Sequence, residues 1–280
     1  MQDFYEEFQI QHINAIKEDF TGNNGLGRYV ILTGSDQRAK DISSRLTKLT
    51  FKPHPRHHNL YLGCIPTLKF SIDVAVISTG MGCASLDIIL NELIILGARR
   101  FLRIGTAGSL QPTKVKVGDI VITTAAVRDE ETSSNYIYKE FPAIASLEYI
   151  LASKRAAFNL SLPYHIGIIH TKSSLYAREF NFSFLQENTE YMKNLHLSGV
   201  LASEMETSHL FILSTLNNYK FKNLNNSDLL AGSILTIVGD DRPFSNNNEQ
   251  IQNGINKGIE LGIETIKEMY YIDIKEKNSI

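Results

Sequence analysis

A strand, a helix and a second strand follow one another closely in the first half of this 280-residue chain, and this unit restricts the fold more than any other feature. Residues 72–79 are almost continuously apolar and rich in β-branched side chains, as in a buried parallel strand. Residues 84–96 carry one broad apolar face at helical spacing: Leu86, Ile89, Leu90, Leu93 and Ile94. Gly97 is typical of the position after a helix, and residues 101–104 predict the next strand. The unit favours a mainly parallel sheet with right-handed crossovers.

The rest of the chain continues this alternation of strands and helices. Further strands are predicted at residues 28–33, 119–127, 164–171 and 232–238, with a hairpin of 59–65 and 69–70 around Pro66. Helical patterns cover residues 36–48, 147–158, 205–217 and 249–269, and the asparagine-rich stretches 223–227 and 245–248 predict surface loops. Neither an internal repeat nor a long linker divides the sequence. We therefore expect one α/β domain over residues 1–280, three layers with a central mixed, mainly parallel sheet and helices on both faces.

Composition and charge exclude several classes of protein. The formal net charge is −2 and no lysine or arginine tract occurs, so we expect no nucleic-acid partner. No apolar run approaches the ~20 residues of a membrane helix, and the acidic N-terminal segment lacks a signal-peptide core. Cys64 and Cys83, the two cysteines, suit a reducing compartment. We expect a cytoplasmic protein with no membrane partner.

Two segments combine a strand end, small residues and an arginine. Residues 101–109, FLRIGTAGS, predict a buried strand over 101–104 and then a loop of small residues, with Arg103 near the strand end. The segment TGSDQR predicts a strand-to-helix junction with Arg38 in the first turn. Backbone N–H groups, hydroxyls and a guanidinium together suit an anion. The plainer alternatives are a tight turn with Arg103 reaching water, and an ordinary helix cap beside a surface Arg38.

Acidic residues stand at two further junctions. The segment ASEMET places Glu204 and Glu206 ahead of an apolar helix, where one carboxylate can face a ligand while the other caps the helix or faces solvent. A carboxylate can accept two hydrogen bonds from a sugar diol, although acids also favour helix starts for electrostatic reasons alone. In VGDDRP, Asp240 and Arg242 follow an apolar strand, and the alternative there is a turn with an exposed ion pair.

Patterns for cofactors, metals and covalent nucleophiles are weak. The segment STGMGC lacks the third glycine and the acidic ribose ligand of a dinucleotide site. His54, His57 and His58 lie in a proline-containing stretch without a spaced cluster of further ligands, which favours a loop. Cys83 is expected to be a small core residue. The sequence shows no recognisable Ser–His–Asp or Cys–His arrangement for nucleophilic catalysis. We expect no metal and no cofactor.

Taken together, these segments resemble the nucleoside phosphorylases of the hexameric and trimeric α/β class, and most closely the uridine phosphorylases. The resemblance runs from about Gln11 to the C-terminal helix. The segments that carry it, in order, are TGSDQRAK, STGMGCASLDIILNEL, FLRIGTAGSLQP, VKVGDIVITTAAVRDEETS, EFPA and LASEMET. It implies a phosphorylase/hydrolase-like fold.

The resemblance assigns roles residue by residue. The implied phosphate-binding residues are Gly34, Arg38, Arg56, Arg103 and Thr106. The implied ribose-binding residues are His12, Met205 and Glu206, and Phe141 matches an apolar wall residue. Arg56 and His12 match residues that a neighbouring subunit contributes. The resemblance thus implies a homo-oligomer, a hexamer built from dimers with shared sites.

The departures from the family pattern concern the base. Bacterial uridine phosphorylases usually carry a Gln-x-Arg pair where this chain has LYAREF, which leaves Tyr176 and Arg178 as the candidates for base binding. Asp240 falls near the aspartate with which purine-specific relatives protonate the base, and Arg242 could match an arginine of pyrimidine-specific ones. An arginine two residues away would keep Asp240 ionised and unsuited to act as an acid. This combination favours a pyrimidine.

The resemblance implies reversible phosphorolysis of uridine to uracil and ribose 1-phosphate, with inorganic phosphate as co-substrate and no cofactor. The implied catalytic residues are Arg103, Glu206, Arg178 and Asp240. Three alternatives remain: a purine nucleoside phosphorylase on the same fold, a nucleoside hydrolase, which would not need three arginines, and a catalytically silent nucleoside-binding homologue.

Overall fold

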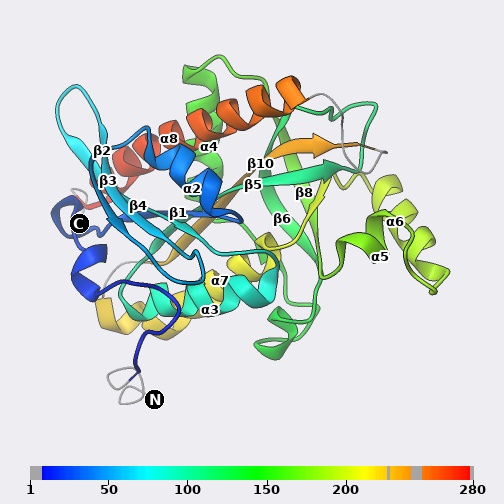
Figure 1. The fold of residues 1–280 in the computed structure, drawn as a ribbon, viewed down its shortest axis with the longest axis horizontal. Helices are drawn as coiled ribbons and strands as arrows, with labels where there is room; N and C mark the ends of the chain where they lie inside the picture. The colour runs from blue at the N-terminus through cyan, green and yellow to red at the C-terminus, as the bar shows by residue number, and fades with distance from the viewer. Residues whose placement is uncertain (1–7, 226–227, 241–247, 278–280) are drawn as a thin grey trace.

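The computed structural model describes residues 8–225, 228–240 and 248–277, and a ten-stranded sheet runs through this part of the chain (Figure 1). The strands are β1 Tyr29–Thr33, β2 Thr47–Lys52, β3 Leu60–Pro66, β4 Ser71–Ser78, β5 Arg100–Ser109, β6 Ile120–Asp129, β7 Ala143–Ile144, β8 His165–Lys172, β9 Ala202–Glu204 and β10 Leu230–Gly239. The helices are α2 Asp36–Ser43, α3 Cys83–Ile95, α4 Leu147–Asn159, α5 Leu175–Glu179, α6 Glu187–Leu197, α7 Thr207–Asn225 and α8 Asn248–Lys277. Short 3₁₀ turns occupy Lys17–Phe20, Asn23–Gly25 and Ser133–Asn135.

The sheet is mixed, with parallel strands at its centre. Strand β1 lies between β4 and β5, parallel to both, and β10 extends the parallel run on the far side of β5. Strands β6, β8 and β9 form a second parallel run. Antiparallel pairings of β10 with β6 and of β9 with β5 join the two runs. Five strands, β5, β10, β6, β8 and β9, are thus paired in a closed ring, and most of the residues discussed below stand at one end of it.

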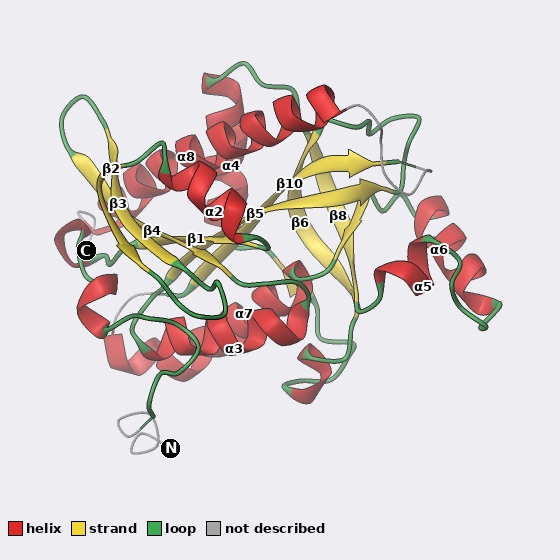
Figure 2. Cartoon of the chain, viewed as in Figure 1, coloured by secondary structure: helices red, strands yellow, loops and turns green. Residues whose placement is uncertain are grey.

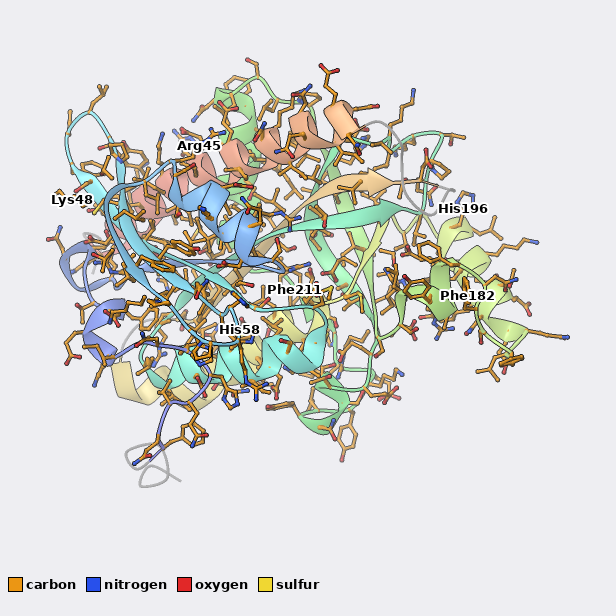
Figure 3. All side chains as sticks on the ribbon, viewed as in Figure 1. Arg45, Lys48, His58, Phe182, His196 and Phe211 are labelled. Carbon is orange, nitrogen blue, oxygen red and sulfur yellow. The ribbon has the colours of Figure 1, made fainter. Side chains whose placement is uncertain are left out.

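Helices cover both faces of the sheet (Figure 2). Helices α3 and α7 contribute to the apolar cluster on one face, and α2, α4 and α8 contribute to the cluster on the other. Phe211 of α7, which Figure 3 labels near the centre of the molecule, is completely buried. The three-layer α/β architecture expected from the alternating pattern is confirmed.

The strand–helix–strand unit of the sequence analysis is present as β4, α3 and β5. Its apolar stripe is buried, as helical spacing predicted: Leu86, Ile89, Leu90, Leu93 and Ile94. Gly97 follows the helix end at Leu96 with a φ of 99°, a left-handed conformation that favours glycine. The turn brings β5 back parallel to β1, two places along the sheet from β4.

Several expected boundaries were wrong, two of them because a neighbouring strand pairs with the segment. The small residues 105–109, expected as a loop, continue strand β5, because β10 and β9 supply hydrogen-bonding partners for them. Residues 36–48, expected as one helix, divide into α2 and the start of β2, which pairs with β3. Residues 223–225 belong to α7 rather than to a loop, whereas 226–227 and 245–247 lie outside the described residues. Pairing partners far away in the sequence decided the two strand cases.

Helices α5 and α6 and the short strand β9 were not expected from the sequence. The two helices project at the right of Figure 3, where Phe182 and His196 are labelled. Their hydrophobic residues lack a clear helical stripe, and the side chain of Phe182 is exposed. Within the three described ranges, no helix is both long and apolar enough to cross a bilayer.

A buried charge cluster connects the start of β5 to the C-terminal helix. The Arg100 guanidinium donates to Asp273 of α8, with 2.8 Å between Nη2 and Oδ1 and 3.1 Å between Nε and Oδ2. Tyr29 of β1 donates its hydroxyl to the same carboxylate at 2.5 Å. All three side chains are buried. The cluster therefore holds β1, β5 and α8 together beneath the end of β5 that is opposite the cavity described below.

Removing the carboxylate should destabilise the fold strongly. In Asp273→Asn, Arg100 remains buried without a counter-charge, so we expect the free energy of unfolding to fall by about 3 kcal/mol in urea denaturation. The control is Glu131→Gln, which removes an ion pair of exposed side chains 3.1 Å apart, with Lys139. That variant should lose no more than about 0.5 kcal/mol. Equal losses in the two variants would contradict the structural role of the Arg100 cluster.

Candidate active site

A cavity of about 320 Å³ lies at the carboxyl ends of strands from the ring. Its walls come from β5, β8, β9 and β10, from the loop between β1 and α2, and from the start of α5. Four of the residues predicted for phosphate line it: Gly34, Arg38, Arg103 and Thr106. Met205, Glu206 and Asp240 line it as well. Ligands of parallel α/β sheets commonly bind at such strand ends.

Arg103 forms the electrostatic centre of this cavity. It is 4% exposed, and its guanidinium donates through Nε to Glu204 at 3.1 Å and through Nη2 to Glu206. A Cβ at Gly105 would lie 2.8 Å from the Arg103 Nη2 atom, so glycine at this position leaves room for the guanidinium. A buried arginine held by two carboxylates is an organised charge, and the alternative of a side chain reaching water does not apply.

Glu204 serves as the structural member of the carboxylate pair. Its carboxylate accepts the N–H groups of Glu206 and Thr207 at 2.9 and 3.0 Å, so it caps the start of α7. The Thr171 hydroxyl donates to it at 2.6 Å. Burial alone would raise the pKa of Glu204, but Arg103 and these donors together lower it. Glu204 is therefore ionised, and its hydrogen-bonding capacity is taken up by the protein.

Glu206 is the less satisfied carboxylate. It is buried at the junction of β9 and α7 and accepts the Gly82 N–H at 2.5 Å. Burial and the neighbouring Glu204 charge raise its pKa, despite the opposing influence of Arg103. Gly82 has a φ of 85° at the start of α3, a conformation that lets its backbone approach this carboxylate. Glu206 is thus the carboxylate available to a ligand in the cavity.

Arg38 supplies a second positive charge. It lies in the first turn of α2, which is capped by the Ser35 hydroxyl, and it lines the same cavity as Arg103. Within the described part of the chain, its guanidinium makes no hydrogen bond or ion pair. Burial and the nearby Arg103 charge lower the pKa of Arg38 to about 10, so it remains protonated at neutral pH. Two guanidiniums beside the Thr106 hydroxyl form a site suited to an anion.

Other predicted site residues lie elsewhere in the monomer. His12 and Arg56 line a separate cavity of about 310 Å³ beside α3, with the His12 Nδ1 2.8 Å from Glu92 and Arg56 exposed. Phe141 packs against the apolar core, and Tyr176 is exposed on α5. None of these four lines the main cavity. Their assignments stay predictions, and Arg242 lies outside the described residues.

Arg178, the sequence candidate for the base, is held outside the lining of the main cavity. Its guanidinium donates two hydrogen bonds of 2.7 Å to the carboxylate of Asp129, and its Nη1 donates to Asn188. It also lies 4.4 Å from the centre of the Tyr191 ring. Protein groups thus occupy the Arg178 guanidinium, and Arg178 is not among the residues that line the cavity. Its role in base binding stays a prediction.

Sequence reasoning missed two charged residues that line the cavity, Lys172 and Glu179. Lys172 is the last residue of β8, and Glu179 is the last residue of α5. The signal that could have found Lys172 is a lysine at the end of an otherwise buried strand. Glu179 gave no comparable signal, because α5 itself was not predicted.

The described residues contain no group of three or more histidine, cysteine or acidic side chains that could hold a metal ion. His54, His57 and His58 lie in the loop between β2 and β3, as expected. Both cysteines are buried, and burial together with nearby carboxylates raises the pKa of the Cys83 thiol well above its ordinary value. Cys83 is therefore a core residue rather than a nucleophile.

A family model described as the phosphorylase superfamily matches residues 28–244. The chain belongs to this superfamily. It is 30% identical over 246 residues to the uridine phosphorylase of Treponema pallidum, covering 86% of this chain and 89% of the relative. It is 32% identical over 191 residues to the purine nucleoside phosphorylase of Plasmodium vivax, covering 66% of this chain and 71% of the relative.

The fold of this phosphorylase-superfamily chain is also similar to a solved structure. The crystal structure of uridine phosphorylase from Vibrio fischeri matches with a TM-score of 0.76 at 24% identity, covering 94% of this chain and 98% of the other. The family model and the Treponema pallidum relative confirm the expected resemblance to this superfamily. The protein is an enzyme of the pentosyltransferase class, similar to uridine phosphorylases.

The two carboxylates beside Arg103 should differ in their effect on stability. The folded pKa of Glu204 is lowered, so its charge stabilises the fold at neutral pH and this contribution disappears as the pH falls through that pKa. The folded pKa of Glu206 is raised, so its ionisation destabilises the fold at neutral pH. At pH 7 we expect Glu204→Gln to lose about 3 kcal/mol of unfolding free energy.

The matched variant Glu206→Gln should lose less than about 1 kcal/mol, because its amide oxygen can still accept from Gly82. Urea denaturation of both variants beside the parent protein measures the difference. A larger loss in Glu206→Gln than in Glu204→Gln would mean that the two carboxylates have been assigned the wrong roles.

Proposed function

We propose that this protein catalyses the reversible phosphorolysis of ribonucleosides, with uridine as the preferred substrate. The observation that carries the proposal is one cavity in which two guanidiniums, those of Arg38 and Arg103, lie beside the carboxylate of Glu206. The two guanidiniums suit a phosphate, and the carboxylate suits a ribose diol. Relatives named uridine phosphorylase support the same reaction.

Phosphate binds between the two arginines in this proposal. Thr106 donates its hydroxyl, and the loop at Gly34, which lines the cavity, leaves space for the anion. An anion there relieves the repulsion between Arg38 and Arg103 and competes with Glu206 for the Arg103 guanidinium. The phosphate is then both nucleophile and counter-charge for the positive charge that develops on the sugar ring. Holding it in place removes much of the entropic barrier of a bimolecular step.

Glu206 positions the ribose in the proposed complex. Its carboxylate accepts hydrogen bonds from the 2′- and 3′-hydroxyls, while Met205, also in the cavity wall, contacts the sugar. The raised pKa of Glu206 reflects a charge that the protein alone satisfies poorly, so two hydroxyl donors stabilise it. Attack by phosphate gives ribose 1-phosphate and the free base directly. The proposal therefore needs no covalent enzyme intermediate and no cofactor.

The preference for uridine rests on sequence similarity more than on the cavity itself. The motifs LASEMET and VRDEETS resemble those of uridine phosphorylases. A purine nucleoside phosphorylase is the second candidate, because Asp240 lines the cavity and could protonate a departing purine. Arg242, the expected partner of Asp240, lies outside the described residues.

We further propose that the smallest active unit is a dimer, and that dimers assemble into a cytoplasmic hexamer of single-domain chains. His12 and Arg56 line their own cavity beside α3 rather than the one that contains Arg103. A neighbouring chain related by two-fold symmetry can bring the same two residues to the site of its partner. Such a site would gain a third arginine for phosphate.

The reaction is tested by measuring base release from uridine, inosine and adenosine, each with and without phosphate. We expect release only with phosphate, and the highest kcat/KM for uridine. Arg38→Gln should raise the KM for phosphate at least about tenfold through the loss of a charge-assisted contact. The control is Arg45→Gln, which changes an exposed arginine just after α2, labelled in Figure 3, and should leave this KM unchanged.

Other outcomes of this assay identify the alternatives. Base release that persists in phosphate-free buffer would make the protein a hydrolase. Faster release from inosine than from uridine, with the inosine activity lost in Asp240→Asn, would make it a purine nucleoside phosphorylase. Absence of release from all three nucleosides would leave a silent nucleoside-binding homologue.

Subunit sharing is tested by complementation. Arg56→Ala chains and Glu206→Gln chains should each be nearly inactive alone, because one group is missing from every site. In a mixed dimer, one site combines an intact Glu206 with an intact Arg56, so subunit exchange should restore up to about a quarter of the parent activity. Activity that stays at the level of the separate variants, or a fully active monomer, would contradict the shared site.

A further inference from the structure

An ion pair of a buried lysine and a half-buried glutamate faces the cavity at a position that none of the roles above uses. Lys172 is 2% exposed, and its ammonium donates to the Glu179 Oε1 at 2.5 Å and to the Ser203 hydroxyl at 2.8 Å. All three residues line the cavity. Burying the Lys172 ammonium beside a half-buried Glu179 costs free energy that a surface pair would not, and the pair therefore calls for a functional explanation.

The pair is held in place by a chain of polar contacts behind it. The Ser203 hydroxyl, which accepts from Lys172, lies 3.0 Å from the Nδ1 of the buried His170. The other ring nitrogen of His170 lies 2.9 Å from Asp129, and Asp129 accepts two hydrogen bonds from Arg178. Arg178 is thus connected to the cavity wall through Asp129, His170 and Ser203, and it also precedes Glu179 on α5. These contacts fix the Ser203 hydroxyl that accepts from Lys172.

The pair retains unused hydrogen-bonding capacity on adjacent atoms. An ammonium has three N–H groups, and two of those on Lys172 have protein partners. The Glu179 Oε2 atom accepts no hydrogen bond within the described part of the chain. A free donor therefore stands next to a free acceptor in the wall of the cavity.

Strand β5 shows which end of the cavity this pair occupies. Arg103, Thr106 and Gly108 follow one another along the strand, and a Cβ at Gly108 would lie 3.3 Å from the Glu179 Oε2 atom. The Arg103 guanidinium lies beside Gly105, so the pair stands about three residues, roughly 10 Å at the rise of a β-strand, farther along β5. The Glu179 carboxylate thus lies beyond the Arg103 guanidinium, toward the carboxyl end of β5. A nucleoside whose reacting carbon faces the arginines would direct its base toward it.

Building on the function proposed above, we propose that Lys172 and Glu179 select nucleosides whose base carries a carbonyl oxygen next to a ring N–H. Lys172 donates to the carbonyl oxygen, and Glu179 accepts from the N–H. Uracil, hypoxanthine and guanine present this edge. Cytosine and adenine present an amino group beside a bare ring nitrogen. Their amino group, a donor, would face the Lys172 ammonium, which is also a donor. Their ring nitrogen, an acceptor, would face the Glu179 carboxylate, which is also an acceptor.

The physical basis of the selection is the cost of buried polar groups left without partners. A site built to hydrogen-bond one edge rejects a base with the opposite pattern much more strongly than a site that distinguishes bases by size. We expect uridine to be favoured over cytidine, and inosine over adenosine, each by at least about a hundredfold in kcat/KM. The selection acts on the edge of the base and is independent of whether a pyrimidine or a purine is preferred.

The experiment compares Glu179→Gln with the parent enzyme on uridine and cytidine. A glutamine amide can donate to the bare nitrogen of cytosine, so the ratio of the two kcat/KM values should fall at least about tenfold. This ratio does not change when a variant merely folds less well, because both substrates see the same active fraction. The KM for phosphate should stay within about twofold, since Arg38 and Arg103 are untouched.

A matched control and a second variant complete the test. Glu264→Gln removes the acid of another lysine pair, 2.9 Å from Lys267 on α8, and should leave the ratio unchanged. Lys172→Gln should lower the uridine to cytidine ratio as Glu179→Gln does. An unchanged ratio in both cavity variants, or a parent enzyme that accepts cytidine as readily as uridine, would overturn the proposal.

Calorimetric titration with free uracil and free cytosine separates this inference from the proposed reaction. If no nucleoside is cleaved but the parent protein binds uracil more tightly than cytosine, and Glu179→Gln removes the difference, edge selection stands without phosphorolysis. If uridine is cleaved but neither cavity variant changes the discrimination, phosphorolysis stands and the roles of Lys172 and Glu179 do not.

Discussion

The burial of Arg103 between two carboxylates is the constraint on which this structure depends. An arginine at 4% exposure cannot be left without counter-charges. Glu204 and Glu206 supply them, and each needs further donors from the starts of α7 and α3. Satisfying one guanidinium therefore requires β5, β9 and the starts of two helices to meet at one point. The cavity lies where they meet.

The balance of charge at this point favours binding over stability. The Arg38 guanidinium has no hydrogen-bond or ion-pair partner among the described residues, and burial together with the nearby Arg103 charge lowers its pKa to about 10. The raised pKa of Glu206 is a related sign that the protein alone satisfies this carboxylate poorly. An anion bound between Arg38 and Arg103 would offset their mutual repulsion. Hydroxyl donors beside Glu206 would stabilise its negative charge. Groups held in this way contribute more to binding a ligand than to stabilising the empty fold.

The closed ring of strands holds two differently charged groups of side chains in the cavity. Arginines from β5 and the start of α2 provide the positive end of the cavity, and the Lys172–Glu179 pair provides adjacent donor and acceptor atoms toward the other end. Because β9 pairs with both β5 and β8, Ser203 stands opposite Gly108 on one side and His170 on the other. The three-residue strand β9 thus connects the two ends, although its sequence gives no strand signal of its own.

The sequence by itself determined the features that depend on local pattern. The apolar stripe of α3, the strand β4 before it and Gly97 after it follow from side chains within one or two turns of each other. Motif similarity also pointed to Arg38, Arg103 and Glu206 and to the superfamily. The tertiary structure decided what depends on distant partners. Strand β5 continues through its small residues because β10 and β9 pair with them. Lys172 is paired in the cavity wall because α5 brings Glu179 to it. Arg178 lies outside the cavity lining because Asp129, 49 residues earlier in the chain, binds its guanidinium, and no local pattern specifies such a pair.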